Sequence, residues 1–547
     1  MFLIPMSTVL VKTYRLALAL CLCAHMACSD EQSRARLAGD ETTLRLAIPS
    51  DVNSLDPAIA YDVVGWPLVR LMYNGLIDYD DDLNLIPWQS RSWDLSEDGH
   101  TLTFVLRPGL RFSNGREIVA QDYVYSLQRV LDPKTKSPGQ GFFRNIVGAR
   151  AFQDGKAPSV TGLSAPNDTT FVIQLEQPDL PFLHVLAMPF AYVVPREEVA
   201  KHPTDFSQHP VGSGPFVLTL WQRGSHLRFE RSPTYAHPEA IRLNGVDLRI
   251  GGDATLHMMM FERGEIDIAS ITANGIPAPD FVRVMNTPRL RQLVESQSLN
   301  ATYYLSLNNE MPPFDNVKVR QAINYAVDRQ RIISLISDRG VFARGVLPPG
   351  MPGFNPKLAG YRYDPDRAKT LLAEAGFPNG FHTELMMLAQ DDTDSKIGQV
   401  VQQNLKDIGV TVDLKPVTSA TSIQALSSRK SVAFGTSAWY QDYPDPSNFL
   451  NVLLNGQRIT DVNCNNVAFY NNPDVNKLLE EAAHDTHQDR RIELYRQAEV
   501  IIVSEAPWVF LYHPKMYVLR QPWLKGMKLN PVWPHRFEKL RIEALEH

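Results

Sequence analysis

A strand–helix–strand segment in the second half of the sequence places the strongest constraint on the fold. A short apolar run at 384–388 is followed by a helical pattern, in which apolar positions within 397–408 share one face and Gly409 ends the helix. Apolar and polar residues then alternate along 410–414, as they do in a strand with one buried face. Because a helical crossover joins strands that run parallel, this half is predicted to contain a partly parallel sheet covered by helices.

The first half of the chain is instead rich in strands that end in turns. Apolar residues alternate with polar or small ones at 44–48, 102–106 and 171–175. Turn-forming pairs such as Pro108-Gly109 follow many of these strands. The 547 residues suffice for roughly three to four domain-sized units at about 150 residues each. The two halves together predict an α/β protein with mixed sheets.

The amino terminus has the parts of a secretory signal. Lys12 and Arg15 precede an apolar run at 16–24, which is too short to cross a bilayer and ends near a small residue. Residues 1–28 are therefore predicted to be a signal peptide and residues 29–39 a flexible tether. An uncleaved membrane anchor is the alternative, and the charges within the segment disfavour it.

The end of this signal resembles the lipobox of bacterial lipoproteins. Ala27 precedes Cys28, the cysteine that would be acylated, although His25 stands where the motif usually has leucine. Acylation of Cys28 would tie the protein to a membrane, whereas an ordinary signal peptide would release it. Cys464 is the one cysteine of the remaining chain, and a buried, inert thiol is predicted for it rather than a reactive one.

Charge and motif spacing argue against several classes of function. The formal net charge is −6, whereas a nucleic-acid binder needs a basic stripe to neutralise phosphates. The glycines at 109–115 lack the spacing of a phosphate-binding loop, and 211–215 lacks that of a nucleophile elbow. His484 and His487 have no third ligand nearby, so no metal site is predicted. We expect no cofactor and no catalytic group.

Six segments carry a resemblance to a known family. They are TLTFVLRPGLRFSNGREIVAQDYVYSLQRVLDP (101–133), VGSGPFVL (211–218), YYLSLNNEMPPFDNVKVRQAINYAVDR (303–329), YDPDRAKTLLAEAGF (363–377), WYQDYPDPSNFL (439–450) and APWVFLYH (506–513). In this order they resemble the bacterial extracellular solute-binding proteins of family 5, the oligopeptide- and dipeptide-binding components of ABC importers. The resemblance covers essentially everything after residue 40.

The resemblance implies a two-lobed periplasmic-binding-protein fold of the α/β class with mixed sheets. Two crossing strands join the lobes, one lobe is discontinuous, and an extra domain is inserted in it. The strand-rich first half and the strand–helix–strand unit in the second agree with this fold. The expected boundaries are 40–75, 195–300 and 505–547 for lobe I, 76–194 for the inserted domain and 301–504 for lobe II.

The resemblance also implies a site, in which an extended ligand lies between the lobes and one aspartate holds its amine. That aspartate follows a tryptophan by three residues, which points to Asp442 after Trp439. A carboxylate suits an ammonium group, because three donors meet an acceptor-only group. Asp445 is the competitor, and organising the proline-rich turn is the alternative role for Asp442. Trp439 either walls a side-chain pocket or fills the core of its lobe.

Other parts of the implied site act through the backbone. Tyr440 and Gln441 are expected to offer backbone groups to the ligand, and so is Asp62-Val63-Val64 on the opposite lobe. Some relatives place a basic residue three positions before the tryptophan to hold the ligand's carboxylate, but Thr436 stands there in this chain. Ligand length and the treatment of the carboxyl end therefore stay open.

The implied function is that of an exported, extracytoplasmic substrate-binding protein, with a lipid anchor at Cys28 if the lipobox is used. It would bind peptides, expected to be oligopeptides, and deliver them as a monomer to the ABC permease and ATPase of the inner membrane. A metal chelate or an oligosaccharide is the alternative solute. A hydrolase outside the cytoplasm is the rival class, and the missing catalytic motifs disfavour it.

Overall fold

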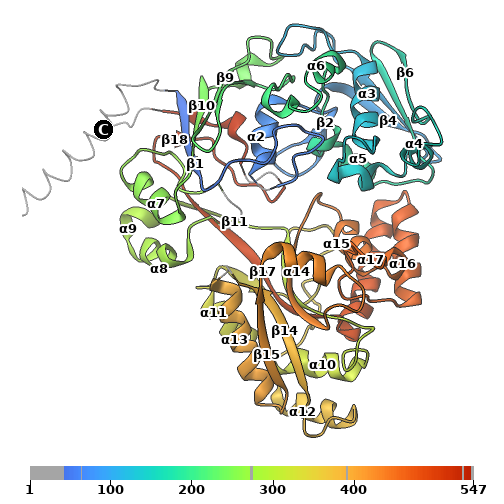
Figure 1. Cartoon of the computed structure of the whole chain (residues 1–547), viewed down its shortest axis with the longest axis vertical. Helices are drawn as coiled ribbons and strands as arrows, with labels where there is room; N and C mark the ends of the chain where they lie inside the picture. Colours follow the sequence, from blue (N-terminus) through green and yellow to red (C-terminus); the bar gives the residue numbers. More distant parts are fainter. Residues whose placement is uncertain (1–41, 63, 272–274, 390–391, 533–534, 544–547) are drawn as a thin grey trace, which may run out of the picture.

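The computed structural model describes residues 42–62, 64–271, 275–389, 392–532 and 535–543. Its elements form two lobes, drawn one above the other in Figure 1. Lobe I is built on two four-stranded sheets, and lobe II on a seven-stranded sheet. The predicted signal peptide and tether and the predicted acylation at Cys28 lie outside the described residues. Within the described part of the chain, no helix combines the length and the apolar character that a bilayer span needs.

The first sheet of lobe I joins segments that are far apart in the sequence. Its first two strands are parallel and the others antiparallel, so residues near 45 lie beside residues near 247. Leu44, Leu46 and Ile48 are fully buried, which confirms the strand predicted from their alternation. The strands, in order across the sheet, are β1 (Thr43–Ile48), β10 (Gly245–Ile250), β9 (His226–Arg231) and β8 (Phe216–Gln222).

A glycine-rich link leads into this sheet across the end of α2 (Gly65–Met72). The backbone N–H of Gly214 donates to the carbonyl of Met72 over 2.8 Å. A side-chain carbon at position 214 would lie 2.4 Å from the carbonyl carbon of Met72. Because only glycine permits so close an approach, backbone packing accounts for the glycine at this position.

The second sheet of lobe I is antiparallel throughout and is covered by short helices. The predicted alternations at 102–106 and 171–175 both form strands, whose apolar positions face one buried cluster. The strands, in order, are β4 (Ser90–Leu95), β5 (Thr101–Leu106), β7 (Thr170–Gln174) and β6 (Leu163–Asn167). The helices beside them are α3 (Ala120–Leu131), α4 (Ala149–Gln153) and α5 (Phe182–Leu186).

The sheet of lobe II is mixed, and it contains the predicted strand–helix–strand unit. β14 and β15 pair in parallel from His382↔Thr411 to Leu388↔Val417, and α13 (Asp392–Lys406) connects them. Gly409 has φ +89°, which a turn after the helix requires and glycine adopts readily. The strands, in order, are β11 (Val294–Ser298), β17 (Trp508–Leu519), β12 (Ala301–Leu307), β16 (Phe434–Tyr440), β14 (His382–Leu388) and β15 (Thr411–Val417), with β13 (Gly340–Phe342) beside β17.

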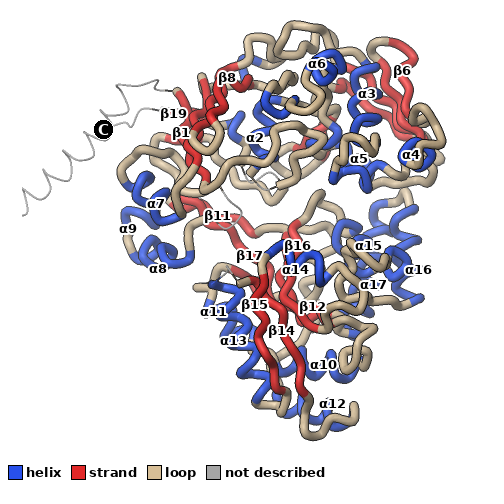
Figure 2. The backbone as a smooth tube through the Cα atoms, viewed as in Figure 1, coloured by secondary structure: helices blue, strands red, loops and turns tan. Residues whose placement is uncertain are grey.

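Two strand segments run between the lobes in Figures 1 and 2. β17 pairs with β12 through its first half and with β11 through its second half. Val509 belongs to the core of lobe II, whereas Met516 and Val518 belong to the core of lobe I. The N–H of Leu299, between β11 and β12, donates to the carbonyl of Pro514 over 3.0 Å. Both crossings therefore lie side by side at this point. The exact domain boundaries given in the sequence analysis stay a prediction.

The remaining helices cover the two lobes. In lobe II, α15, α16 and α17 form a helical group beside the sheet (Figure 1). The helices are α6 (Arg196–Lys201), α7 (Ala254–Glu262), α8 (Ala278–Asn286), α9 (Pro288–Arg291), α10 (Val317–Ala326), α11 (Arg329–Leu335), α12 (Pro365–Glu374), α14 (Ser419–Leu426), α15 (Ser447–Leu454), α16 (Pro473–His484) and α17 (Gln488–Glu505). The short strands are β2 (Ile77–Tyr79), β3 (Leu85–Pro87), β18 (Leu524–Lys525) and β19 (Arg541–Ile542).

Candidate ligand-binding site

Asp442 lies where the two lobes meet, in the loop between β16 and α15. Its side chain accepts hydrogen bonds from the Tyr61 hydroxyl of lobe I at 2.6 Å and from Nδ2 of Asn448 at 3.0 Å. Its backbone N–H donates to Oδ1 of Asn448 over 2.9 Å. Only 9% of the residue is exposed. The carboxylate is thus held in a fixed position by one group from each lobe.

The charge of Asp442 has no cationic partner among the described residues, where every ion pair involves other carboxylates. Burial raises the pKa of Asp442, and the hydrogen bonds from Tyr61 and Asn448 offset only part of that rise. A buried carboxylate without a cation is costly, so such groups are paired or functional in most proteins. The arrangement suits a carboxylate whose counter-ion is supplied by a bound molecule.

Asp445, the competing carboxylate, is already neutralised inside lobe II. It pairs with Arg491 of α17 at 3.0 Å, and both side chains are almost completely buried. Burial alone would raise the pKa of Asp445, but the charge of Arg491 outweighs it and the net pKa lies below its usual range. Asp445 also accepts the N–H of Ser447 at the start of α15. Asp445 thus helps to organise the turn. Asp442 also bonds to Asn448 across this turn, but its charge has no cationic partner among the described residues.

Trp439 packs partly against the core of lobe II, and its role as the wall of a side-chain pocket stays a prediction. Its indole Nε1 donates to Oδ1 of Asn448 over 3.1 Å, the same oxygen that receives the N–H of Asp442. Its ring packs partly against the core of lobe II and stays partly exposed. Trp439 therefore helps to orient Asn448, which in turn orients Asp442.

The two residues after Trp439 use their side chains more than predicted. The hydroxyl of Tyr440 lies 2.8 Å from the hydroxyl of Tyr303. Gln441 donates its backbone N–H to the carbonyl of Asn300, and its side-chain amide reaches the carbonyl of Pro531 over 2.9 Å. Gln441 is therefore a second link between lobe II and a segment that packs on lobe I.

On lobe I, the predicted segment 62–64 begins the turn into α2. Oδ1 of Asp62 accepts the N–H groups of Val64 at 3.1 Å and Gly65 at 2.6 Å, which fixes the chain just after Tyr61. Val63 lies outside the described residues. The backbone contacts of this segment with a ligand stay a prediction.

Aromatic rings close the junction around Asp442. The ring of Tyr61 lies 5.5 Å from that of Trp66 and 5.4 Å from that of Phe190. Tyr443 of lobe II enters the buried cluster around the second sheet of lobe I and stacks on His184 at 6.5 Å. Burial lowers the pKa of His184 to about 4, so this ring is neutral at pH 7. The surroundings of Asp442 are therefore apolar and aromatic.

Sequence reasoning missed Tyr61, Tyr443 and Asn448 as parts of this junction. Tyr443 and Asn448 lie inside the segment 439–450 that was singled out, and Tyr61 immediately precedes 62–64. Their contacts join positions up to 381 residues apart, so spacing alone carried no signal for them.

The remaining predicted residues have local partners. The hydroxyl of Thr436 donates to Oδ2 of Asp394 over 2.8 Å. Cys464 is buried, as predicted. His484 contacts its own helix and His487 contacts Asp485, so the described structure does not bring the two together with a third ligand.

Comparisons with known proteins agree with this architecture. The family described as bacterial extracellular solute-binding proteins, family 5 middle, matches residues 84–461. Heme-binding protein A of Haemophilus influenzae is 31% identical over 494 residues, which are 86% of this chain and 87% of the relative. Oligopeptide-binding protein OppA of Bacillus subtilis is 29% identical over 490 residues, with the same coverage of both chains.

Solved structures give the same result for the fold. The clavulanic acid biosynthesis oligopeptide binding protein 2 superposes with a TM-score of 0.84 at 26% identity, covering 91% of this chain and 95% of the other. The periplasmic binding protein DppA of Helicobacter pylori in complex with the peptide STSA has a TM-score of 0.77 at 26% identity, covering 92% and 98%. The predicted fold class is confirmed.

Proposed function

The chain belongs to family 5 of the bacterial extracellular solute-binding proteins, and we propose that the solute it binds is a peptide with a free amino terminus. As a member of this family it is a binding component of an ABC importer that works outside the cytoplasm. It is not an enzyme, so the hydrolase alternative is wrong. Oligopeptides are the preferred ligand class, and the permease and ATPase complex of the inner membrane is the partner that receives them.

One observation carries the proposal: Asp442 is a buried carboxylate between the lobes without a cationic partner among the described residues. An ammonium group offers three donors, and a carboxylate has about four acceptor positions, of which Tyr61 and Asn448 use two. A peptide amine can therefore bind Asp442 without displacing either neighbour. Charge-assisted hydrogen bonds of this kind are about twice as strong as neutral ones.

Ligand entry requires the lobes to separate. The bonds from Tyr61 to Asp442 and from Gln441 to Pro531 span the junction and must break in the open form. The segments around Leu299 and Pro514 are the natural hinge positions, because both strand connections pass between the lobes there. Closing around the peptide would restore the aromatic seal and exclude water from the ion pair.

The names of similar proteins favour a peptide but include other solutes. The oligopeptide-binding relative of Bacillus subtilis and the peptide complex of the Helicobacter pylori protein support the peptide. Heme-binding protein A, at 31% identity, favours heme as the second candidate. A metal chelate or an oligosaccharide has no observation of this kind in its favour.

Native mass spectrometry of the purified protein tests the ligand class, since a receptor of this type often keeps its ligand from the host cell. We expect released masses that fragment as peptides, and calorimetric binding of a free-amine peptide that is lost on N-acetylation. Retention of heme, seen by its absorbance, together with equal binding of free and acetylated peptide, would support the second candidate and refute the first.

The domain arrangement and the membrane anchor are further parts of the proposal. We assign 40–75, 195–300 and 505–547 to lobe I, 76–194 to the inserted domain and 301–504 to lobe II, except that the first half of β17 packs in lobe II. Acylation of Cys28 would hold the protein at the membrane, where a monomer could meet the permease. Extraction of native protein only with detergent would support acylation, and a soluble mature protein that starts elsewhere would contradict it.

A further inference from the structure

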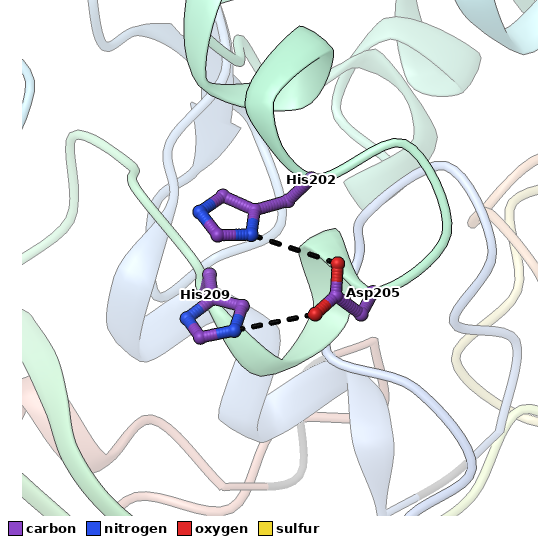
Figure 3. A group of neighbouring side chains, drawn as sticks. All are labelled: His202, Asp205 and His209. Carbon is purple, nitrogen blue, oxygen red and sulfur yellow. Dashed lines mark ion pairs between the residues drawn. The ribbon is translucent and has the colours of Figure 1, made fainter.

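Three side chains that commonly bind metal ions meet in one loop of lobe I (Figure 3). Nδ1 of His202 lies 3.5 Å from Oδ1 of Asp205, and Nε2 of His209 lies 3.3 Å from Oδ2 of the same carboxylate. The two imidazole rings stack with centroids 4.0 Å apart. All three potential ligand atoms lie within 4.8 Å of one another.

The loop that carries these residues is anchored at its start and in its middle. His202 follows α6 directly, and Asp205 and His209 flank a short 3-10 turn at 206–208. Phe206 is buried in the core of lobe I, and the hydroxyl of Ser207 accepts the N–H of Leu55 at 2.7 Å. Ligands that project from a fixed turn lose little freedom on binding an ion, so the loop suits a preformed site.

The two nitrogen–oxygen separations, each to a different oxygen of Asp205, are close to those around a transition-metal ion. In a tetrahedral site with bonds of about 2.0–2.1 Å, neighbouring ligand atoms lie about 3.3 Å apart. Two imidazoles and one carboxylate suit zinc and its first-row neighbours, whereas calcium and magnesium prefer oxygen ligands alone. A single divalent ion could bind both ring nitrogens and the carboxylate that they face.

Two other histidine–aspartate pairs lack this convergence. His382 meets Asp413 at 3.0 Å, and His226 meets Asp247 at 3.2 Å, but each pair contributes one imidazole only. Within the described ranges, the loop at 202–209 is the single place where three such groups converge.

Asp205 also forms part of the wall of a cavity of about 640 Å³, which His202 and His209 do not line. The guanidinium of Arg129, also in that wall, is paired with Asp56, so its charge is compensated. Two nitrogens and one oxygen leave at least one coordination position of a four-coordinate ion open.

We propose that His202, Asp205 and His209 form a binding site for a divalent transition-metal ion, with zinc as the leading candidate. The hydrogen bonds and ion pairs of these residues in the described structure involve none of the groups around Asp442. The site is therefore separate from the junction between the lobes. A bound ion would tie the end of α6 to the following turn and stabilise lobe I.

Calorimetry with zinc chloride on the full-length, EDTA-treated protein tests the proposal. We expect one ion per chain, and an affinity that falls at least about tenfold in His202→Gln, His209→Gln and Asp205→Asn, since loss of even an outer partner of a ligand has an effect of that size. The control His382→Gln removes an exposed histidine of another ion pair and should bind zinc like the wild type. Absence of one-to-one binding, or equal affinity in the three variants, would overturn the site.

Two further measurements keep the test independent of folding. Cobalt(II) added to the wild type should give the d–d absorption of a tetrahedral ion, and zinc should remove it. Zinc should also raise the melting temperature of the wild type and of His382→Gln but not that of the three ligand variants, because an ion stabilises only the form that binds it. A cobalt spectrum of a purely six-coordinate, aqueous type would refute the proposal without any variant.

Discussion

Replacing Asp442 with asparagine should separate ligand affinity from protein stability. The substitution removes the charge but almost no volume, and the new amide can still accept from Nδ2 of Asn448 while its own N–H₂ faces the Tyr61 hydroxyl, which can accept. Burial raises the pKa of Asp442 in the folded protein above the pKa that this aspartate has in the unfolded chain. At any pH above the unfolded-state pKa, ionisation of Asp442 therefore lowers the free energy of unfolding. Asp442→Asn is therefore expected to be at least as stable as the wild type at pH 7.

Peptide affinity should change in the opposite direction. Truncating one partner of a desolvated ion pair costs about 2–5 kcal/mol, which corresponds to a roughly 30- to 5000-fold weaker Kd. Isothermal titration calorimetry should compare a free-amine peptide with its N-acetylated form on both proteins. Acetylation should weaken binding to the wild type strongly, because it removes the ammonium charge that pairs with Asp442. It should weaken binding to Asp442→Asn only slightly, because this variant has no carboxylate at that position.

Thermal unfolding and a matched substitution complete the experiment. Asp413→Asn removes an exposed carboxylate of another ion pair and should alter neither peptide affinity nor the effect of acetylation. Affinity of Asp442→Asn within about threefold of the wild type (~0.7 kcal/mol), in a protein that melts normally, would refute the assignment. An acetylation effect of equal size in both proteins would refute it as well.

Three other predictions concern Tyr61, the charge of Asp442 and the buried pair of Asp445 and Arg491. Tyr61→Phe keeps the ring contacts but removes the hydrogen bond to the Asp442 carboxylate, so calorimetry should show a peptide affinity lower by about 1.5–3 kcal/mol. The control Tyr363→Phe changes an exposed tyrosine and should have no effect. Peptide affinity should be complete above the raised pKa of Asp442 and should decline as the pH falls through it, before the usual aspartate pKa of about 3.9 is reached; a wild-type profile that stays flat to about pH 4 would contradict this. Arg491→Met leaves Asp445 buried and unpaired, so it should lower the free energy of unfolding, measured by urea titration, by about 3–5 kcal/mol. The neighbouring control Arg490→Met removes an exposed ion pair and should lower it by less than about 1 kcal/mol.

The metal-binding group shows a signal that was present in the sequence and was not used. His202, Asp205 and His209 are separated by three and four residues, a spacing that a single turn can bring together. Sequence reasoning considered His484 and His487 instead, which lie three residues apart, and found no third ligand for them. Only the turn at 206–208 shows which histidines face a common carboxylate.

The choice between Asp442 and Asp445 shows what spacing cannot decide. Both carboxylates lie in one proline-rich segment, and either could face a ligand. Arg491 neutralises Asp445 from a helix 46 residues further along the chain, which no local pattern reveals. Packing between elements decides which buried carboxylate acquires a cationic partner. It therefore also decides that Asp442 is the one without such a partner among the described residues.

The sequence by itself determined the local elements, the family and therefore the two-lobed fold. Strand alternation at 44–48, the helix and strands around 397–408 and the glycine turn at 409 depend on neighbouring residues, so they can be read without a structure. Only the tertiary structure decided that Tyr61 of lobe I reaches Asp442 of lobe II, that Tyr443 enters the core of the opposite lobe, and that β17 divides its length between two cores. These contacts join positions hundreds of residues apart, and their formation depends on how whole lobes dock, which is governed by long-range burial rather than by the local preference of any segment.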